Sequence, residues 1–396
     1  MNKPIVLPMR AGIASRQAHA DIPPGTYERE IGREGFGGQA THMYHRHAPT
    51  AWLRWDGPHR PRAYDLNQLP AAAQGLDGAL DCPLDAPLVA GNAHMRLRCW
   101  KPSAPMRHLA RNADGDELLF VHEGGGDLYC DYGHLRLRDG DYLLLPRGTA
   151  WRYEPAAPSF LLLLEATGDS FRLPERGLLG EHALFDAGVL DVPQLDEAFV
   201  AQQHAARREW AVRIQARHRV STLTYPHNPL DALGWKGTLA PVRLNWRDIR
   251  PVLSARYHLP PSAHTTFLTQ RVAVCTFCPR PAETDPGALK VPFFHSNDDY
   301  DELLFLHAGR FFSRDGMGPG AMTFHPAGFP HGPHPAAYRN SLSAPRTELH
   351  EVAINIDARD PLDIGPGMAA FERAGHADSW RGYLDAPEDK TEQVTA

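Results

Sequence analysis

The sequence predicts a mainly β protein made of two related β-barrels, with a short helical connection between them. Thirty-four Gly and thirty-six Pro are spread along all 396 residues, which favours many turns and short strands over a helical bundle. Apolar residues make up 42% of the chain, enough for sizeable cores. An internal repeat, with one copy in each half of the chain, indicates that the two barrels share one design.

The repeat has two parts. Residues 110–124 and 295–309 are identical at nine of fifteen positions without a gap. Residues 140–151 then align with residues 320–331, and both stretches have the form G-x5-P-x-G-x2 followed by one residue that differs. One supersecondary unit is therefore used twice.

The second copy resembles the two cupin motifs. It reads H-x-N-x4-E-x6-G from His295 to Gly309, and then G-x5-P-x-G-x2-H from Gly320 to His331. Such motifs lie on antiparallel strands of a small jelly-roll barrel. Two cupin-type barrels in one chain are therefore the expected architecture.

The two copies differ where a metal could bind. His295 is replaced by Ala110 in the first copy, and His331 is replaced by Trp151. Neither Ala nor Trp can bind a metal, so only the second copy keeps two histidines together with Glu302. Two imidazoles and one carboxylate form a facial triad that suits non-haem Fe(II), and zinc or manganese are compatible with the same donors.

Other residues of the repeat are less informative. Glu117 is retained in the first copy, so the two histidines, rather than the carboxylate, predict the metal. Asn297 stands where many cupins have a further histidine, which leaves one more coordination position open. His122 and His307 occur in both copies, on the strand face opposite the glutamate, and are interpreted as packed or surface histidines.

These differences predict three segments. Residues 1–190 are expected to form an N-terminal β domain with a degenerate, metal-free cupin. Residues 191–240 are expected to be a helical connection, with a helix over 195–219 that is rich in Ala, Arg, Gln and Glu. Residues 241–396 are expected to form the metal-binding cupin.

Composition argues against several classes of function. The formal net charge of −6 and the absence of long like-charge runs argue against nucleic-acid binding. Five scattered cysteines argue against a disulfide framework, and the single pair Cys275 and Cys278 is interpreted as structural. With no apolar run long enough for a signal peptide or a membrane span, a cytoplasmic protein without a membrane partner is expected. Exposed strand edges favour a homo-oligomer.

Three further stretches, residues 44–52, 228–241 and 323–333, make the chain resemble the homogentisate 1,2-dioxygenases. The second is similar to the family's P-F-D-x2-x-W-x-G-x3-P segment, and the third ends in the family's P-H-G-P. The resemblance implies a cofactor, Fe(2+), a small aromatic substrate and O2, and ring cleavage to maleylacetoacetate in tyrosine and phenylalanine catabolism.

The resemblance also assigns residue roles. It implies that His295, Glu302 and His331 are the iron ligands. His258, in a segment like the family's x-D-H-x-x-P-S, would be the base that accepts the proton of the ring hydroxyl. His325 would be a catalytic group near the iron that can hydrogen-bond the substrate.

Two departures from the family pattern leave alternatives open. The family has five residues between the first histidine and the glutamate, whereas six separate His295 from Glu302, so Asp301 is a rival ligand. The family's substrate-binding Tyr is replaced by Phe311 or Phe312. A related cupin dioxygenase acting on gentisate or a hydroquinone, a bicupin metal isomerase and a bicupin binding or storage protein therefore remain as alternatives.

Overall fold

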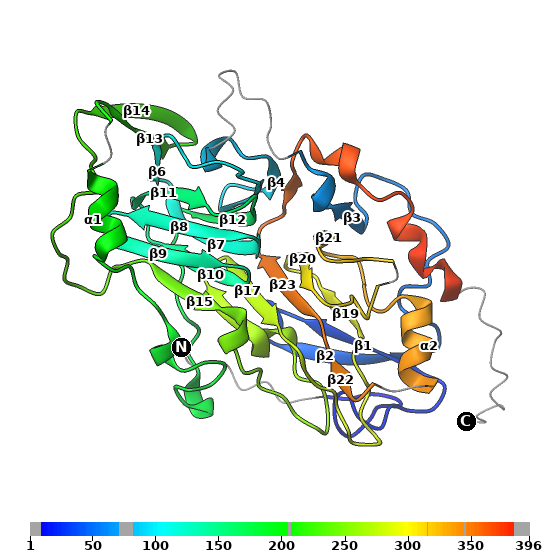
Figure 1. Cartoon of the computed structure of the whole chain (residues 1–396). Helices are drawn as coiled ribbons and strands as arrows, with labels where there is room; N and C mark the ends of the chain where they lie inside the picture. Colours follow the sequence, from blue (N-terminus) through cyan, green and yellow to red (C-terminus); the bar gives the residue numbers. More distant parts are fainter. Residues whose placement is uncertain (1–8, 71–81, 205–206, 315, 344–345, 384–396) are drawn as a thin grey trace.

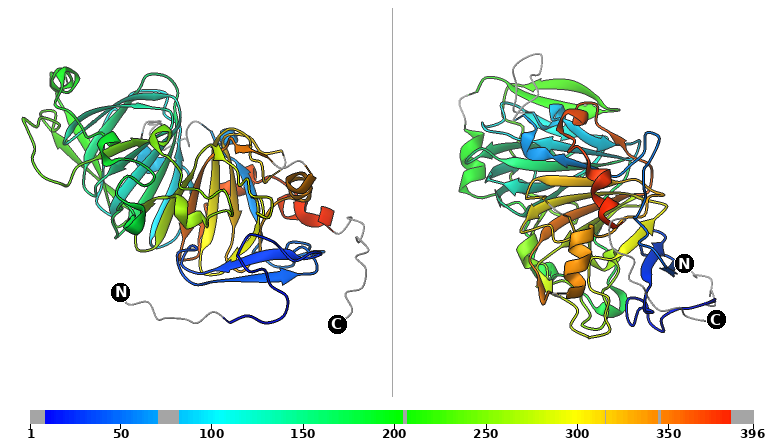
Figure 2. Two further views of the ribbon diagram at one scale, coloured as in Figure 1. Left: turned by 90° about the horizontal axis from the view of Figure 1, so that it is seen from below. Right: turned by 90° about the vertical axis from the view of Figure 1, so that its right-hand side faces the viewer.

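The computed structural model confirms a mainly β protein with two barrels side by side (Figures 1 and 2). The structure describes residues 9–70, 82–204, 207–314, 316–343 and 346–383. Within these ranges the α-helices are short: α1 spans Glu197–Gln203 and α2 spans Pro335–Ser343.

The first barrel consists of two sheets. The seven-stranded sheet has the order β15-β10-β7-β12-β5-β4-β24, formed by Val242–Asn245, Asp141–Leu145, Gly115–Glu123, Phe160–Thr167, Met95–Trp100, Leu88–Gly91 and Asp363–Ile364. The six-stranded sheet has the order β14-β13-β6-β11-β8-β9, formed by Arg219–Tyr225, Trp210–Ala216, Leu109–Asn112, Ala150–Pro155, Gly125–Cys130 and Gly133–Arg138.

The second barrel also has two main sheets. One has the order β16-β17-β23-β20-β21-β3, formed by Thr265–Leu268, Val272–Phe277, Val352–Ala358, Asp301–Ala308, Ala321–His325 and Arg62–Asp65. The other has the order β19-β1-β2, formed by Phe294–Asn297, Tyr27–Gly32 and Ala40–His45. A short pair, β18 and β22, joins Arg280–Pro281 to Glu348–Leu349.

The two barrels exchange segments reciprocally. The hairpin β1–β2 and the strand β3 precede the first barrel in the sequence but pair with β19 and β21 of the second barrel. The hairpin β13–β14 and the strand β15 precede the strands of the second barrel but pair with β6 and β10 of the first. The boundary expected at residue 240 therefore falls within a segment that completes the first barrel.

The expected helix over residues 195–219 is corrected by the structure. Asp196 caps α1 by accepting a hydrogen bond from the Phe199 backbone N–H, and the helix ends at Gln203. Further on, Trp210 and Val212 are buried, and β13 pairs in parallel with β6. Helix propensity is a weak preference that pairing and burial override, so the second half of the segment is a strand.

The barrels pack against each other through the strand faces that lie opposite Glu117 and Glu302. Leu118 and Phe120 of β7 share one core cluster with Leu303 and Phe305 of β20. The alternation expected from the sequence, with His122 and His307 on the strand face opposite the glutamate, is present, and the structure adds that the glutamate side faces into its own barrel.

His122 and His307 meet at this interface between the two copies. Their Nδ1 atoms lie 2.9 Å apart, so one ring donates its proton to the lone pair of the other. Both side chains are buried. Burial and the neighbouring ring lower the pKa of His122 to about 3, and burial lowers the pKa of His307 to about 4.

Acid is therefore expected to destabilise the interface. An unfolded histidine has a pKa near 6.5, so between about pH 6.5 and 4 the unfolded chain binds protons that the folded pair does not. Each of these histidines should lower the free energy of unfolding by up to about 1.4 kcal/mol per pH unit over that range. Urea unfolding at several pH values measures this slope. The double variant His122→Asn, His307→Asn should have a flatter slope, and an unchanged slope would contradict the assignment.

Candidate metal centre

His295, Glu302 and His331 converge inside the second barrel although they come from separate elements. His295 lies on β19 and Glu302 lies on β20 of the facing sheet. His331 follows β21, where its backbone N–H and carbonyl pair reciprocally with those of His295 at 2.9 Å. One ligand atom from each of the three side chains lies within 4.8 Å of the others.

Backbone carbonyl groups fix the orientation of both imidazole rings through their Nδ1 atoms. The Nδ1 atom of His295 lies 3.2 Å from the Phe293 carbonyl, and that of His331 lies 3.1 Å from the Phe329 carbonyl. A carbonyl accepts a proton from Nδ1, so each ring presents the lone pair of Nε2 to the site. The two Nε2 atoms lie 3.9 and 3.5 Å from Oε2 of Glu302.

The Nε2 atoms of His295 and His331 and the Oε2 atom of Glu302 are all acceptors, and they face one another inside the barrel. A cation bound between them would satisfy all three. The Nε2 atom of His331 has no hydrogen-bond partner among the residues that the structure describes. Burial opposes ionisation of Glu302, but His331, His295 and His325 lower its pKa well below its usual range. A carboxylate that faces two imidazole nitrogens is a donor set for a divalent transition metal.

Asp301, the rival carboxylate, has another function. One of its oxygens accepts a hydrogen bond from the Ala327 backbone N–H at 2.7 Å, and the other accepts one from the Leu362 backbone N–H at 2.8 Å. Adjacent residues on a strand point to opposite faces. Glu302, and not Asp301, therefore faces the two histidines.

His325 contacts Glu302 directly. Its Nδ1 lies 2.8 Å from Oε1 of Glu302, and its ring stacks on His331 with centroids 4.4 Å apart. Its Nε2 lies 3.5 Å from the buried guanidinium of Arg314. Since Arg314 can only donate, His325 carries its proton on Nδ1 and donates it to Glu302. The structure thus places His325 where it orients the carboxylate.

The first barrel shows how the same place is filled without a metal. Trp151 occupies the position of His331, and its Nε1–H donates to Oε2 of Glu117 at 3.3 Å. Burial and the nearby Glu165 raise the pKa of Glu117 to about 7. Asn112, the counterpart of Asn297, donates to Glu165 at 2.9 Å. An indole replaces the two histidines and completes an apolar core.

His258 lies one ring away from the triad. Phe293 separates it from His295, with ring centroids 4.2 Å from His258 and 4.7 Å from His295. The Nδ1 atom of His258 lies 3.3 Å from the Leu289 carbonyl, and its Nε2 has no hydrogen-bond partner within the described ranges. Burial and the neighbouring His19 lower the pKa of His258 well below 6.5. The ring is neutral at pH 7 and can accept a proton.

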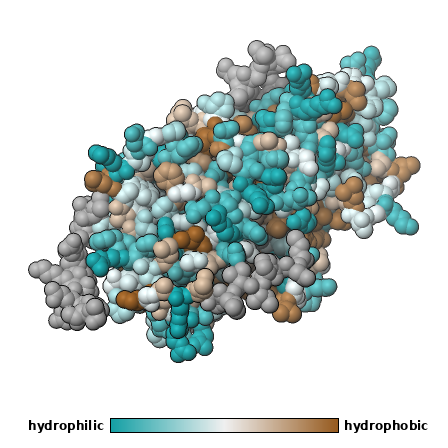
Figure 3. All heavy atoms as spheres, turned by 180° about the vertical axis from the view of Figure 1, so that it is seen from behind, coloured by the Kyte–Doolittle hydropathy of each residue, from teal (hydrophilic) through white to brown (hydrophobic). Residues whose placement is uncertain are grey.

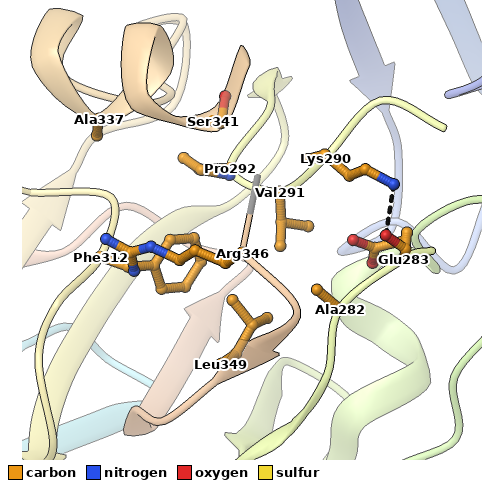
Figure 4. Close-up of a pocket in the computed structure, with 10 residues that line it drawn as sticks. All are labelled: Ala282, Glu283, Lys290, Val291, Pro292, Phe312, Ala337, Ser341, Arg346 and Leu349. Carbon is orange, nitrogen blue, oxygen red and sulfur yellow. Dashed lines mark hydrogen bonds between the residues drawn. The ribbon is translucent and has the colours of Figure 1, made fainter. Parts of the chain in front are cut away.

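The two phenylalanines that depart from the family pattern lie outside the triad. Phe311 packs into a core cluster with Leu304 and Leu306. Phe312 lines a pocket of about 10 Å³ beneath α2, with Arg346 over its ring (Figure 4). The sequence therefore supplies no tyrosine where the family has one.

Sequence reasoning missed a second group of ionisable side chains near His258. His19, Glu28 and His42 form one group of possible ligands, and His19, Glu30 and His258 form another. The signal was present in the strand 27–32, where Glu28 and Glu30 alternate with outward-facing residues and are buried. Two buried acids on one strand face need positive partners.

Two observations concern the molecular surface and the cysteines. The face shown in Figure 3 is largely hydrophilic, with hydrophobic residues scattered in small groups. Among the described residues, no helix has the length and apolar character needed to cross a membrane. Cys275 and Cys278 are buried free thiols.

Comparisons with known proteins give relatives among the dioxygenases. Residues 86–246 match the family described as homogentisate 1,2-dioxygenase N-terminal. A protein of Saccharolobus solfataricus whose name assigns it to the dioxygenases is 29% identical over 366 residues, covering 89% of this chain and 92% of the relative. The homogentisate 1,2-dioxygenase of Rhodopseudomonas palustris is 26% identical, covering 85% of this chain and 75% of the relative.

Further matches include the homogentisate 1,2-dioxygenase of Bradyrhizobium diazoefficiens, 26% identical over 68% of this chain and 62% of the relative. Among solved structures, a cupin 2 conserved barrel domain protein from Leptotrichia buccalis aligns with 76% of this chain and 98% of its own. Its sequence identity is 8% and its TM-score is 0.33.

Proposed function

This chain belongs to the homogentisate 1,2-dioxygenase family, and we propose that it is an Fe(II)-dependent enzyme that cleaves the ring of homogentisate with O2 to give maleylacetoacetate. The observation that carries the proposal is the triad, in which the Nε2 atoms of His295 and His331 face the carboxylate of Glu302. Two imidazoles and one carboxylate with open positions are the donor set of non-haem iron oxygenases. The family relationship supports a cupin dioxygenase; the substrate, the product and the dependence on Fe(II) are the proposed parts.

The chain's own residues would perform three tasks. His295, Glu302 and His331 would hold the iron, which when bound brings O2 and the diphenol into contact and activates both. His325 and Arg314 keep the carboxylate oriented from behind. Phe293, which packs between His295 and His258, would place an apolar ring beside the site.

His258 would act as the base. Its ring is neutral, and its Nε2 lone pair is not engaged by any residue that the structure describes. A phenolic proton could therefore pass to His258 Nε2 when the substrate binds, with Leu289 holding Nδ1–H in place. Deprotonation makes the ring electron-rich and prepares it for reaction with oxygen.

The experiment is a comparison of substrates. Protein purified without oxygen is loaded with one equivalent of Fe(II), and O2 uptake is followed together with absorbance of a ring-opened product. Homogentisate, gentisate and hydroquinone are tested side by side. We expect iron-dependent uptake with homogentisate alone.

Each other outcome has a definite meaning. Uptake with gentisate or hydroquinone would keep the ring-cleaving triad but reject homogentisate as substrate, in line with Phe311 in place of the family's tyrosine. Absence of uptake with all three would reject the dioxygenase and favour a bicupin metal isomerase. We also propose, from the sequence, a cytoplasmic location and a homo-oligomer, which this assay does not address.

A further inference from the structure

We propose that His19, Glu30 and His42 form a second site for a divalent transition metal, next to the triad and oriented by Glu28. This site lies outside the proposed function and does not depend on it. His19 comes from the segment before β1, Glu30 from β1 and His42 from β2.

The donor atoms of the three side chains lie close together, with one oxygen of Glu30 facing each histidine. His19 Nε2 lies 3.0 Å from Glu30 Oε2 and 3.3 Å from His42 Nε2, and His42 Nε2 lies 3.8 Å from Glu30 Oε1. These separations are as short as those of the triad, where the Nε2 atoms lie 3.5 and 3.9 Å from the carboxylate. Ligands of one ion at bond lengths near 2.1 Å stand about this far apart.

Glu28 holds His19 in the orientation that a ligand needs. Its Oε1 lies 2.6 Å from His19 Nδ1 and accepts a hydrogen bond from the His19 backbone N–H at 3.2 Å. Its Oε2 accepts a hydrogen bond from Tyr44 at 3.0 Å. A carboxylate behind a ligating histidine fixes the ring and makes its other nitrogen a better donor. His19 also has a φ of 61°, a conformation that non-glycine residues adopt mainly where the surroundings impose it.

The two sites share one row of the sheet. Glu30 pairs with His42 across β1–β2 and with His295 across β1–β19. Paired residues point to the same face. The row His42–Glu30–His295 therefore runs from the second site into the triad, and His258 lies between them, stacked on His19 with centroids 3.7 Å apart.

The internal repeat again supplies a control. The hairpin β13–β14 pairs with β6 of the first barrel as β1–β2 pairs with β19. In that hairpin, Arg213 opposite Thr222 takes the place of Glu30 opposite His42. Ala211 opposite Thr224 takes the place of Glu28 opposite Tyr44. The donor set is present only in the hairpin attached to the barrel with the triad.

The rival occupant is a proton. Burial disfavours a charged His19, but contacts with Glu28 and Glu30 raise its pKa to about 9, so a protonated ring can balance part of the charge. A proton on His19 Nε2 can be donated to Glu30, and His42 Nε2, 3.3 Å away, then has no donor when His42 carries its own proton on Nδ1. A divalent ion would bind both Glu30 and His42 and would balance both carboxylates.

The donors select the class of metal. Two imidazole nitrogens and a carboxylate suit zinc, iron or cobalt, whereas magnesium and calcium prefer oxygen ligands only. A hollow of about 420 Å³ reaches Glu28 and Phe293 from the surface, which gives an ion a route to the cluster.

Metal counting tests the proposal. Full-length protein is stripped with a chelator, given excess Co²⁺ without oxygen, desalted and analysed for cobalt per chain. We expect two ions in the wild type, one in His42→Gln, which keeps the triad, and one in His295→Ala, which keeps the second site. The matched control Thr222→Ala, at the same place on the other hairpin, should keep two. Cobalt absorption spectra should differ between the two single-ion variants.

The opposite result is clear. One ion in both the wild type and His42→Gln, with none in His295→Ala, would overturn the second site and leave a protonated ion-pair cluster. Loss of both ions in a folded His42→Gln would also overturn it, because the sites would not be separate. Glu30→Gln, checked for folding by circular dichroism, gives an independent reading and should also retain one ion.

Discussion

The Glu302→Gln variant is expected to lose iron and with it all measurable turnover. Glutamine keeps the size of the side chain and can still accept the hydrogen bond from His325. It removes the negative charge, however, and places an amide where both Nε2 lone pairs require a cation. Loss of an outer partner of a ligand typically costs 10- to 100-fold in metal affinity, so loss of the anionic ligand should cost more than about 100-fold. Iron per chain after anaerobic loading is the measurement.

Asp301→Asn is the matched control for this experiment. Asp301 accepts two backbone hydrogen bonds, from Ala327 and Leu362, and an amide can accept only one of them in place. We expect a loss of about 1–3 kcal/mol in stability with iron retained. Iron lost from Asp301→Asn but kept in Glu302→Gln would reverse the ligand assignment.

The His258→Ala variant is expected to keep its iron and to turn over about 10²- to 10⁴-fold more slowly, the usual contribution of a general base. His258 is separated from His295 by Phe293, so its loss leaves the triad intact. The kcat for homogentisate and iron per chain are measured on the same preparation.

A second buried histidine of the same segment provides the control. His264 is buried like His258, and burial lowers its pKa to about 3, but its ring contacts Phe277 instead of Phe293. His264→Ala should reduce stability with little effect on kcat at a temperature where it is folded. Equal turnover of His258→Ala and the wild type would remove His258 from the mechanism.

The triad could be predicted from the sequence because the repeat contains its own comparison. In the alignment of the two copies, His295 corresponds to Ala110 and His331 corresponds to Trp151. These two differences in chemistry stand out because the surrounding positions of the repeat are alike. Such a signal is local: a residue type at a fixed place in a motif. The preference for Glu302 over Asp301 was also local, since it depended on Glu117 at the same place in the repeat and on the spacing to Gly309.

The remaining features depend on pairing between distant segments. Strand β3 has four residues and nothing in its composition indicates β21 as its partner. Arg314 lies in a stretch that reads as a turn, yet its guanidinium is buried behind His325. The second cluster depends on β1 lying beside β19. Contacts between segments that are far apart in the sequence cannot be predicted from local residue patterns in one sequence.

The reciprocal exchange of segments also bears on how the protein is made. Glu34 donates its backbone N–H to Asp299, 265 residues further along the chain. At 5–20 residues per second, the ribosome would deliver the partner of the first hairpin roughly 13 to 53 seconds after the hairpin itself. During that interval Glu28, Glu30 and their edge strand have no sheet to join. Nascent chains should therefore need protection at their first 65 residues, and a ribosome stalled before residue 290 should carry a first barrel but no assembled metal centre.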